Sequence, residues 1–506
     1  MGRPQVVGGA ISAIRERFAV VAGQSERTTL LGTILLASAV SAVTVFVLTQ
    51  YYSVDALSSL VFIPDDCSLD WGMKIGRHCF TDYAWPVSYG MRPDPWESFP
   101  VYVQSGVQLA HNNYPAAGMV PQMIFGVLGK WSGAPQLGLI GYLLALTVAI
   151  LTPAVWAAWG ARGLERVVVF VACGVAAIPA WMAIDRGNSV GFVAPVALVF
   201  LVALCRRRWG LVAIMAILAA LVKPQFVPLA VALFAARQWR WGSIAVAGAV
   251  ISNVAAYALW PRDFPETITQ SLHNTLGYGT FQALVIHFNA SFAKGLLVVP
   301  DAIKARDTGG AIPDGFLAGP RSLIGYAVLV LVVVCVLALA RRIPPVMAGI
   351  VLLATAALFP AVSFPYYLVF VLPVAALVAR DPDGLPGTGI FDRLTTVGGR
   401  RRAVGVCVSL AAALSIAHIA LPSPPIHADM AGQLQVGAEA VHRTVVLTTV
   451  GLTPLLWLIA CGAIVISYAR RPASSSSVDQ SLAGEEPPDT EISTSSIPEL
   501  DRSSPL

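Results

Sequence analysis

The residues best suited to chemistry lie between 50 and 134, in a long polar stretch of an otherwise apolar chain. Six acids stand among aromatic residues in its part from 64 to 100: Asp65, Asp66, Asp70, Asp82, Asp94 and Glu97. A carboxylate beside a membrane costs free energy unless it has a partner or a task. One such group can take the proton from an attacking hydroxyl. Any single acid could instead pair with a nearby Lys or Arg on a solvated loop surface, but the stretch is too long and too aromatic for a simple connector.

Cationic and neutral polar residues that could bind a leaving phosphate occur further along the chain. A departing phosphate is already a stable anion, so it needs cationic or hydrogen-bonding groups to receive it. Lys223 precedes Pro224 between two half-length apolar runs and would either hold a phosphate or extend its ammonium group to the interface. Arg186 would bind the phosphate too, or pair with Asp185 at a turn. Asn289 and Ser291 are candidate hydrogen-bond partners for a sugar or phosphate.

The elements that must position these residues are transmembrane helices. Charged residues make up only 12% of the 506 residues, against about one quarter in an average soluble domain, and the mean hydropathy is +0.70. Apolar blocks reach the roughly 20 residues that a helix needs to cross hydrocarbon, without the alternation typical of barrel strands. The basic residues lie at the ends of these blocks, which argues against nucleic-acid binding.

The sequence predicts an all-α polytopic membrane protein with about twelve helices. Clusters of Arg and Lys mark cytoplasmic ends, which makes 1–27 cytoplasmic and places two long loops, 50–134 and 261–321, outside. The segment 114–131 is expected to form a re-entrant or interfacial helix. Residues 470–506 are expected to form a disordered cytoplasmic tail. Within the transmembrane domain 28–469 the expected spans are 28–49, 135–159, 165–184, 188–205, 209–222, 224–236, 241–260, 322–340, 344–361, 363–379, 403–421 and 446–469.

Cys67 and Cys79 both lie in the first outside loop, where an oxidising compartment permits a disulfide. The alternative is two unpaired thiols. The sequence contains no cluster of His, Cys and Asp with metal-ligand spacing, and no P-loop or GxGxxG motif. It therefore requires no cofactor, and leaves the need for a divalent cation open.

The order of these features resembles the GT-C membrane glycosyltransferases, in particular family 87. That family includes polyprenyl-phosphate-dependent mannosyltransferases and α-(1→3)-arabinofuranosyltransferases. The resemblance covers about residues 28–380 and rests on several short blocks in the same order: TDY (81–83), NNYPAAGMVPQMIF (112–125), DRGN (185–188), LAALVKPQFVPLAVALFAARQWR (218–240), FPETITQSLHN (264–274), HFNASFAKG (287–295) and SFPYYLVFVLP (363–373). The family's tyrosine-proline-proline is replaced by Tyr114-Pro115-Ala116, and its histidines by Tyr366-Tyr367.

The resemblance implies a GT-C fold, with extracytoplasmic loop helices, in the inner membrane of a bacterium. It implies transfer of an arabinofuranosyl or mannosyl group from a polyprenyl-phosphate donor to a cell-envelope glycan or glycolipid, with inversion, on the extracytoplasmic side. Asp82 matches the loop acid expected to act as general base, with Asp66 and Asp65 as alternatives directly after the first span. The matching blocks also make Tyr114, Asn188, Tyr366 and Tyr367 candidates for substrate binding.

A second hypothesis is a transporter or flippase of a lipid-linked saccharide. It predicts broken helices around a midplane site and inverted repeats; the sequence shows one broken pair, at Lys223, and no second copy. A partner subunit without activity is a third and weaker hypothesis.

Overall fold

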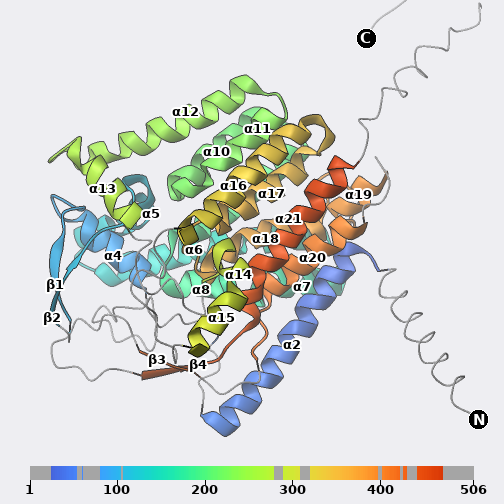
Figure 1. Cartoon of the computed structure of the whole chain (residues 1–506), viewed down its shortest axis with the longest axis horizontal. Coiled ribbons are helices and arrows are strands. Elements are labelled where there is room, and N and C mark those ends of the chain that lie inside the picture. The colour runs from blue at the N-terminus through green and yellow to red at the C-terminus, as the bar shows by residue number, and fades with distance from the viewer. Residues whose placement is uncertain are drawn as a thin grey trace, which may run out of the picture.

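The fold is described from a computed structural model of the chain. The structure describes residues 24–53, 60, 80–103, 106–277, 289–307, 320–396, 402–421, 426–429 and 442–470. Helices dominate this part of the chain and pack side by side into one bundle (Figure 1). The predicted all-α membrane class is thereby confirmed. Asp65, Asp66, the Cys67–Cys79 pair and the predicted C-terminal tail lie outside the described residues.

Five of the described helices are long and apolar enough to cross a membrane. Many of their large apolar side chains are exposed, as expected for contact with lipid. The first, α2, begins at the N-cap Ser25, whose side chain accepts the backbone N–H of Thr28. The five are α2 (Glu26–Tyr52), α6 (Pro135–Trp159), α12 (Trp239–Ala256) with η5 (Tyr257–Leu259), α16 (Pro320–Leu339) with η8 (Ala340–Arg342), and η10 (Thr449–Leu452) with α21 (Thr453–Ala469).

A sixth candidate span is broken in the middle. It consists of α7 (Gly163–Phe170), the π-helical turn η2 (Val171–Val175) and α8 (Ile178–Arg186), which is inclined by 48° to the first half. A π-helical turn and a proline within a helical run are both recognised causes of helix bending, and Pro179 lies directly after the break. The bend directs the end of α8, and the DRGN residues with it, toward α4 (Thr81–Gly90).

Six shorter apolar helical segments fill the other predicted spans. They are η3 (Ser189–Phe192) with α9 (Val193–Cys205), α10 (Trp209–Val222), η4 (Pro224–Ala230) with α11 (Val231–Ala235), α17 (Pro345–Leu358), η9 (Pro365–Phe370) with α18 (Val371–Ala379), and α20 (Arg402–Ile416). A 14-residue helix is about 21 Å long, less than the hydrocarbon thickness of about 30 Å. The structure therefore supports five or six crossings by length, and twelve full crossings remain a prediction.

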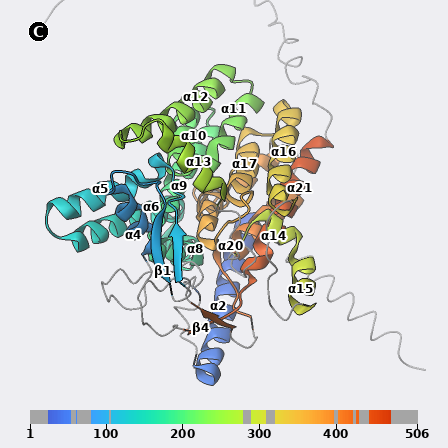
Figure 2. The same ribbon diagram turned by 60° about the vertical axis from the view of Figure 1, so that its left-hand side comes forward.

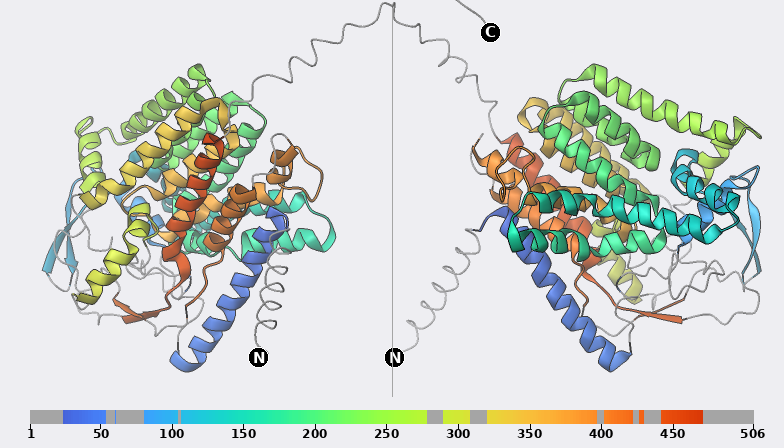
Figure 3. Two further views of the ribbon diagram at one scale, coloured as in Figure 1. Left: turned by 45° about the vertical axis from the view of Figure 1, so that its right-hand side comes forward. Right: turned by 180° about the vertical axis from the view of Figure 1, so that it is seen from behind.

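The core lies around α17 and α18, and every residue of α18 is buried. α18 packs against α2, α6, α9 and α20. On the outside of the bundle, α12 lies along α10 and α11, whereas the second half of α2 extends beyond its neighbours (Figures 1 and 3). The short helices α17 and α18 are therefore core elements rather than lipid-facing ones.

Smaller elements cover the end of the bundle that loop charge predicts to be outside. Two antiparallel hairpins, β1 (Phe99–Val103) with β2 (Gly106–Ala110) and β3 (Ile426–Asp429) with β4 (His442–Val445), occur in the described residues. The helices are α4, α5 (Ala116–Trp131), α13 (Glu266–Gly277), α14 (Phe292–Leu296) and α15 (Val298–Asp307). The expected short helix over 114–131 is thus observed as α5, which forms a hairpin with α6 (Figure 2). A side chain at Gly138 would lie 2.5 Å from the Phe125 carbonyl oxygen, so glycine permits this close approach.

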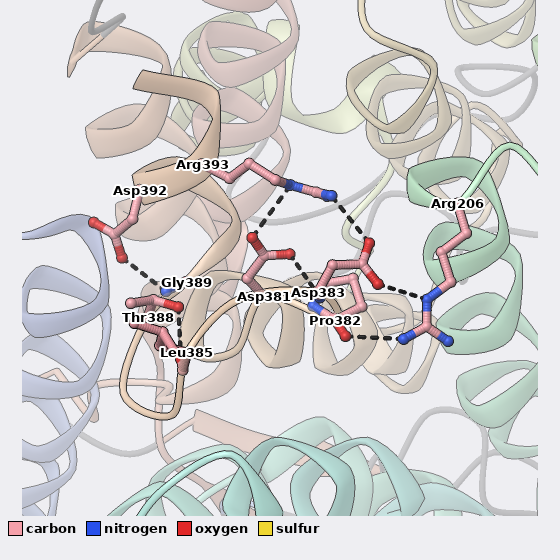
Figure 4. Close-up of polar contacts among 9 residues, drawn as sticks. All are labelled: Arg206, Asp381, Pro382, Asp383, Leu385, Thr388, Gly389, Asp392 and Arg393. Carbon is pink, nitrogen blue, oxygen red and sulfur yellow. Dashed lines mark hydrogen bonds and ion pairs between the residues drawn. The ribbon is translucent and has the colours of Figure 1, made fainter. Parts of the chain in front are cut away.

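Residues predicted to be cytoplasmic meet at the other end of the bundle. Arg206 donates to Asp383, and Arg393 of α19 (Ile390–Thr396) pairs with both Asp381 and Asp383 (Figure 4). Arg27 pairs with Glu165 and donates to the backbone carbonyl oxygens of Ala379 and Gly387. Segments separated by up to 360 residues thus share one polar end, in agreement with the directions assigned from loop charge.

Candidate functional site

Asp82 lies in the first turn of α4, a ten-residue helix in the first predicted outside loop. The backbone N–H of Phe80 donates to the carbonyl oxygen of Asp185 at 2.9 Å, which ties the start of α4 to α8. A carboxylate in the first turn of a helix is stabilised by the unpaired backbone N–H groups there. The side chain of Asp82 is nevertheless buried, so it needs partners from other elements.

The DRGN segment supplies two of these partners. Gly187 has a φ of +66° and ends α8, which brings Arg186 and Asn188 to the carboxylate. Arg186 donates from Nε to Oδ2 of Asp82 at 3.2 Å and from Nη2 to Oδ1 at 3.1 Å. Asn188 donates from Nδ2 to Oδ2 at 2.8 Å, while its own Oδ1 accepts the N–H of Val190. The paired guanidinium and carboxylate form the two-point contact that favours arginine over lysine.

Tyr114 supplies the third partner, from the loop in front of α5. Its hydroxyl donates to Oδ1 of Asp82 at 2.5 Å. Its backbone is held by Asn112, whose Oδ1 accepts the Tyr114 N–H at 2.9 Å, and by Trp96, whose indole N–H donates to the Tyr114 carbonyl oxygen. Pro115 then begins α5 by fixing an extended backbone at the N-cap. Tyr114 is therefore a loop residue with a well-anchored backbone.

Lys223 separates α10 from η4, as the Lys-Pro pair predicts. A proline disfavours helical geometry at the residue before it, and Lys223 accordingly has an extended backbone with φ −146° and ψ 114°. Its side chain is buried, and its ammonium nitrogen lies 4.9 Å from the ring centroid of Tyr114 and 5.8 Å from that of Tyr367. Both distances fall within the range of cation–π attraction. The lysine therefore extends into the same site as Asp82 rather than toward solvent.

These contacts set the charge state of Asp82. Burial alone raises the pKa of this carboxyl group, but Arg186, the hydrogen bonds from Tyr114 and Asn188, and the charge of Lys223 together hold the pKa below its ordinary value. The acid is therefore ionised at neutral pH. Two buried cations face one buried carboxylate, an arrangement that can accommodate an additional anion.

The structure brings six predicted site residues into one cluster and places a seventh, Tyr366, beside it. Asp82 contacts Tyr114, Arg186 and Asn188, and Tyr114 links this group to Lys223, which also faces Tyr367. Tyr366 lies beside Tyr367, with ring centroids 5.2 Å apart. Their convergence agrees with the site expected from the sequence, whereas their roles with a substrate remain predictions.

Asn289 and Ser291 have structural contacts that the sequence did not indicate. Asn289 donates to the carbonyl oxygen of Ala361, and its Oδ1 accepts the backbone N–H groups of Ser291 and Ser363. Ser291 is the N-cap of α14 and accepts the N–H of Lys294. The Asn289 side chain thus holds the second predicted outside loop against the segment before η9, whereas the Ser291 side chain caps α14. Any contact of either with a sugar or phosphate stays a prediction.

Sequence reasoning missed Gln122 and Asn112, which stabilise the site from α5 and the loop before it. Gln122 is fully buried and donates to the backbone carbonyl oxygen of Asp82 at 3.2 Å. Asn112, also buried, holds Tyr114 as described above. For Gln122 the available signal was a polar side chain inside an apolar helix, which a buried hydrogen-bonding role explains.

Within the described ranges, no three His, Cys, Asp or Glu side chains are grouped so that they could hold a metal ion. The five cysteines in those ranges are free thiols and lie in or at the ends of helices of the bundle. No protein-family model and no curated protein matches this sequence. The site's chemistry must therefore be argued from its geometry.

Proposed function

We propose that the protein is an integral-membrane glycosyltransferase that moves a sugar from a polyprenyl-phosphate donor to a hydroxyl group of a cell-envelope glycan or glycolipid. The observation that carries this proposal is the buried cluster in which the ionised Asp82 lies beside Arg186 and Lys223. A proton acceptor for the hydroxyl and cationic groups that receive the phosphate are suited to displacement of a phosphate by a hydroxyl. An arabinofuranosyl or mannosyl group remains our proposal for the sugar.

The proposed reaction is a single displacement with inversion at the anomeric carbon. Asp82 takes the proton of the acceptor hydroxyl as its oxygen bonds to that carbon. The bond from the carbon to the phosphate oxygen breaks, and Arg186 and Lys223 stabilise the departing polyprenyl phosphate. Asn188 keeps the carboxylate oriented through its 2.8 Å hydrogen bond. This site would act on the extracytoplasmic side of a bacterial inner membrane, since the Arg-rich ends of the helices lie at the opposite end.

The test is transfer of radiolabelled sugar by the purified full-length protein, with polyprenyl-phosphate arabinofuranose and mannose as donors and a soluble disaccharide as acceptor. Asp82→Ala should lower turnover by about 10²-fold to 10⁴-fold, the usual contribution of a general base, with little loss of donor binding. Asp383→Ala, at the opposite polar end, serves as the matched control and should transfer normally. Near-normal transfer by Asp82→Ala would show that another acid is the base.

A flippase of a lipid-linked saccharide is the second candidate, because two helical segments are broken near the site. The α7–α8 pair bends by 48°, and α10 ends at Lys223, and broken helices at a binding site are a feature of transporters. The two functions differ in outcome: transfer of label to the acceptor excludes a pure flippase, whereas movement of the labelled lipid across vesicles without transfer excludes the glycosyltransferase.

A further inference from the structure

Tyr114 contacts both halves of the site. Its hydroxyl is 2.5 Å from Oδ1 of Asp82, while its ring faces the Lys223 ammonium group at 4.9 Å. One neutral side chain thus connects the group that would take a proton with a group that would hold the phosphate. Anything that draws the ammonium away from the ring weakens the attraction on that side.

The carboxylate of Asp82 is saturated with hydrogen bonds in this structure. Oδ1 accepts from Tyr114 and from Nη2 of Arg186, and Oδ2 accepts from Nε of Arg186 and from Asn188. An ionised carboxylate offers about four lone-pair sites. An acceptor hydroxyl can therefore reach Asp82 only when one of these donors leaves.

Tyr114 is the donor best suited to leave. Arg186 is charged, buried and bound at two points, and Asn188 is fixed by its bond to the Val190 N–H. The Tyr114 hydroxyl is neutral and makes a single bond to the carboxylate from a half-buried side chain. It is also an O–H donor, as a sugar hydroxyl is, so one can replace the other at Oδ1.

We propose that the Tyr114 hydroxyl occupies the place of the acceptor hydroxyl at Asp82 and keeps water from that place until the donor phosphate engages Lys223. This inference rests on the proposed function and makes Tyr114 a positioning residue. When the phosphate attracts the Lys223 ammonium, the Tyr114 ring loses that contact, and its hydroxyl gives way to the acceptor. The base is thereby exposed only when a donor is bound.

Removing the hydroxyl should let water use the base. A water molecule at Oδ1 passes a proton to Asp82, its oxygen bonds to the anomeric carbon, and the bond to the phosphate oxygen breaks. The products are the free sugar and polyprenyl phosphate. Tyr114→Phe retains the ring over Lys223 and removes only the hydroxyl, so it isolates this effect.

The experiment measures donor hydrolysis without acceptor and sugar transfer with acceptor, and compares their ratio between the wild type and Tyr114→Phe. We expect the ratio to rise about tenfold or more, the factor that one hydrogen bond to a charged group contributes. Tyr257→Phe is the matched control, because its hydroxyl also makes a buried hydrogen bond, 2.7 Å to Ser271, but away from Asp82. It should keep the wild-type ratio.

A structural role for Tyr114 would lower both rates together and leave the ratio unchanged, and this result would overturn the inference. If Tyr114→Phe does not yield folded protein, Tyr114→Leu, which has no side-chain hydrogen-bond donor, carries the same expectation and the same refuting result. A wild-type protein that transfers no sugar from either donor would instead refute the proposed function. The two failures are therefore distinguishable.

Discussion

The ion pair between Asp82 and Arg186 can be tested without knowledge of a substrate. The two side chains are 7% and 1% exposed, so water screens the pair very little. Removing one partner of such a buried pair generally costs about 3–5 kcal/mol, because the other charge stays in a low-dielectric site. We expect Asp82→Asn, which keeps the shape but not the charge, to lower the free energy of unfolding by about that amount.

The matched control is the ion pair between Arg206 and Asp383 at the opposite end of the bundle (Figure 4). Its atoms are closer, at 2.8 Å, but both side chains are 39% exposed. Exposed pairs contribute about 0–1 kcal/mol. Asp383→Asn should therefore cost much less than Asp82→Asn, although the two substitutions are chemically identical.

Reversible unfolding of the full chain in mixed micelles, by titration with SDS, measures both values. A double-mutant cycle with Arg186→Met then isolates the pair, and the doubly substituted protein should be less destabilised than the sum of the single variants by up to about 3 kcal/mol. Strict additivity, or a cost for Asp82→Asn no greater than that for Asp383→Asn, would refute the assignment of a buried, coupled pair.

Three further outcomes follow from the site. Lys223→Met should weaken binding of polyprenyl phosphate by about 10-fold to 100-fold in a titration, whereas Lys130→Met, at an exposed position, should not. The pKa of Asp82 is lower in the folded protein than the value of about 3.9 in the unfolded chain, so its charge stabilises the fold fully above that pH and less as pH falls toward the folded pKa. The difference in free energy of unfolding between the wild type and Asp82→Asn should therefore shrink below about pH 4. A difference that grows on acidification would contradict this. Gly163→Ala, at a φ of +53° with open space around the new Cβ, should cost about 1–2 kcal/mol of stability. Gly187→Ala, at a φ of +66°, should cost more, because its new Cβ would lie 2.9 Å from the Cβ of Tyr83. Equal losses of the two variants in thermal denaturation would show that Tyr83 moves freely.

Local sequence predicted where the helices lie, because each apolar block and each proline acts on its own stretch of backbone. The Lys-Pro pair suffices to indicate the break at Lys223. Likewise, the length of its apolar block suffices to indicate the short helix that ends at Trp131. Hydropathy could not distinguish a helix facing lipid from one facing protein, because both surroundings are apolar. The complete burial of α18 (Val371–Ala379) is therefore a result of the tertiary structure.

The residue types of the site were available from the sequence, but their partners were not. Arg186 has an acid as its immediate neighbour in the chain, yet its guanidinium pairs with Asp82, 104 residues away. Likewise, nothing near Tyr114 in the sequence indicates that it joins Asp82 to Lys223. A buried charge binds whichever partner the packing of helices brings within about 3 Å, and that distance depends on the whole bundle. The sequence by itself determined a helical membrane protein with acids and cations between its apolar blocks, and only the tertiary structure decided which of them form one site.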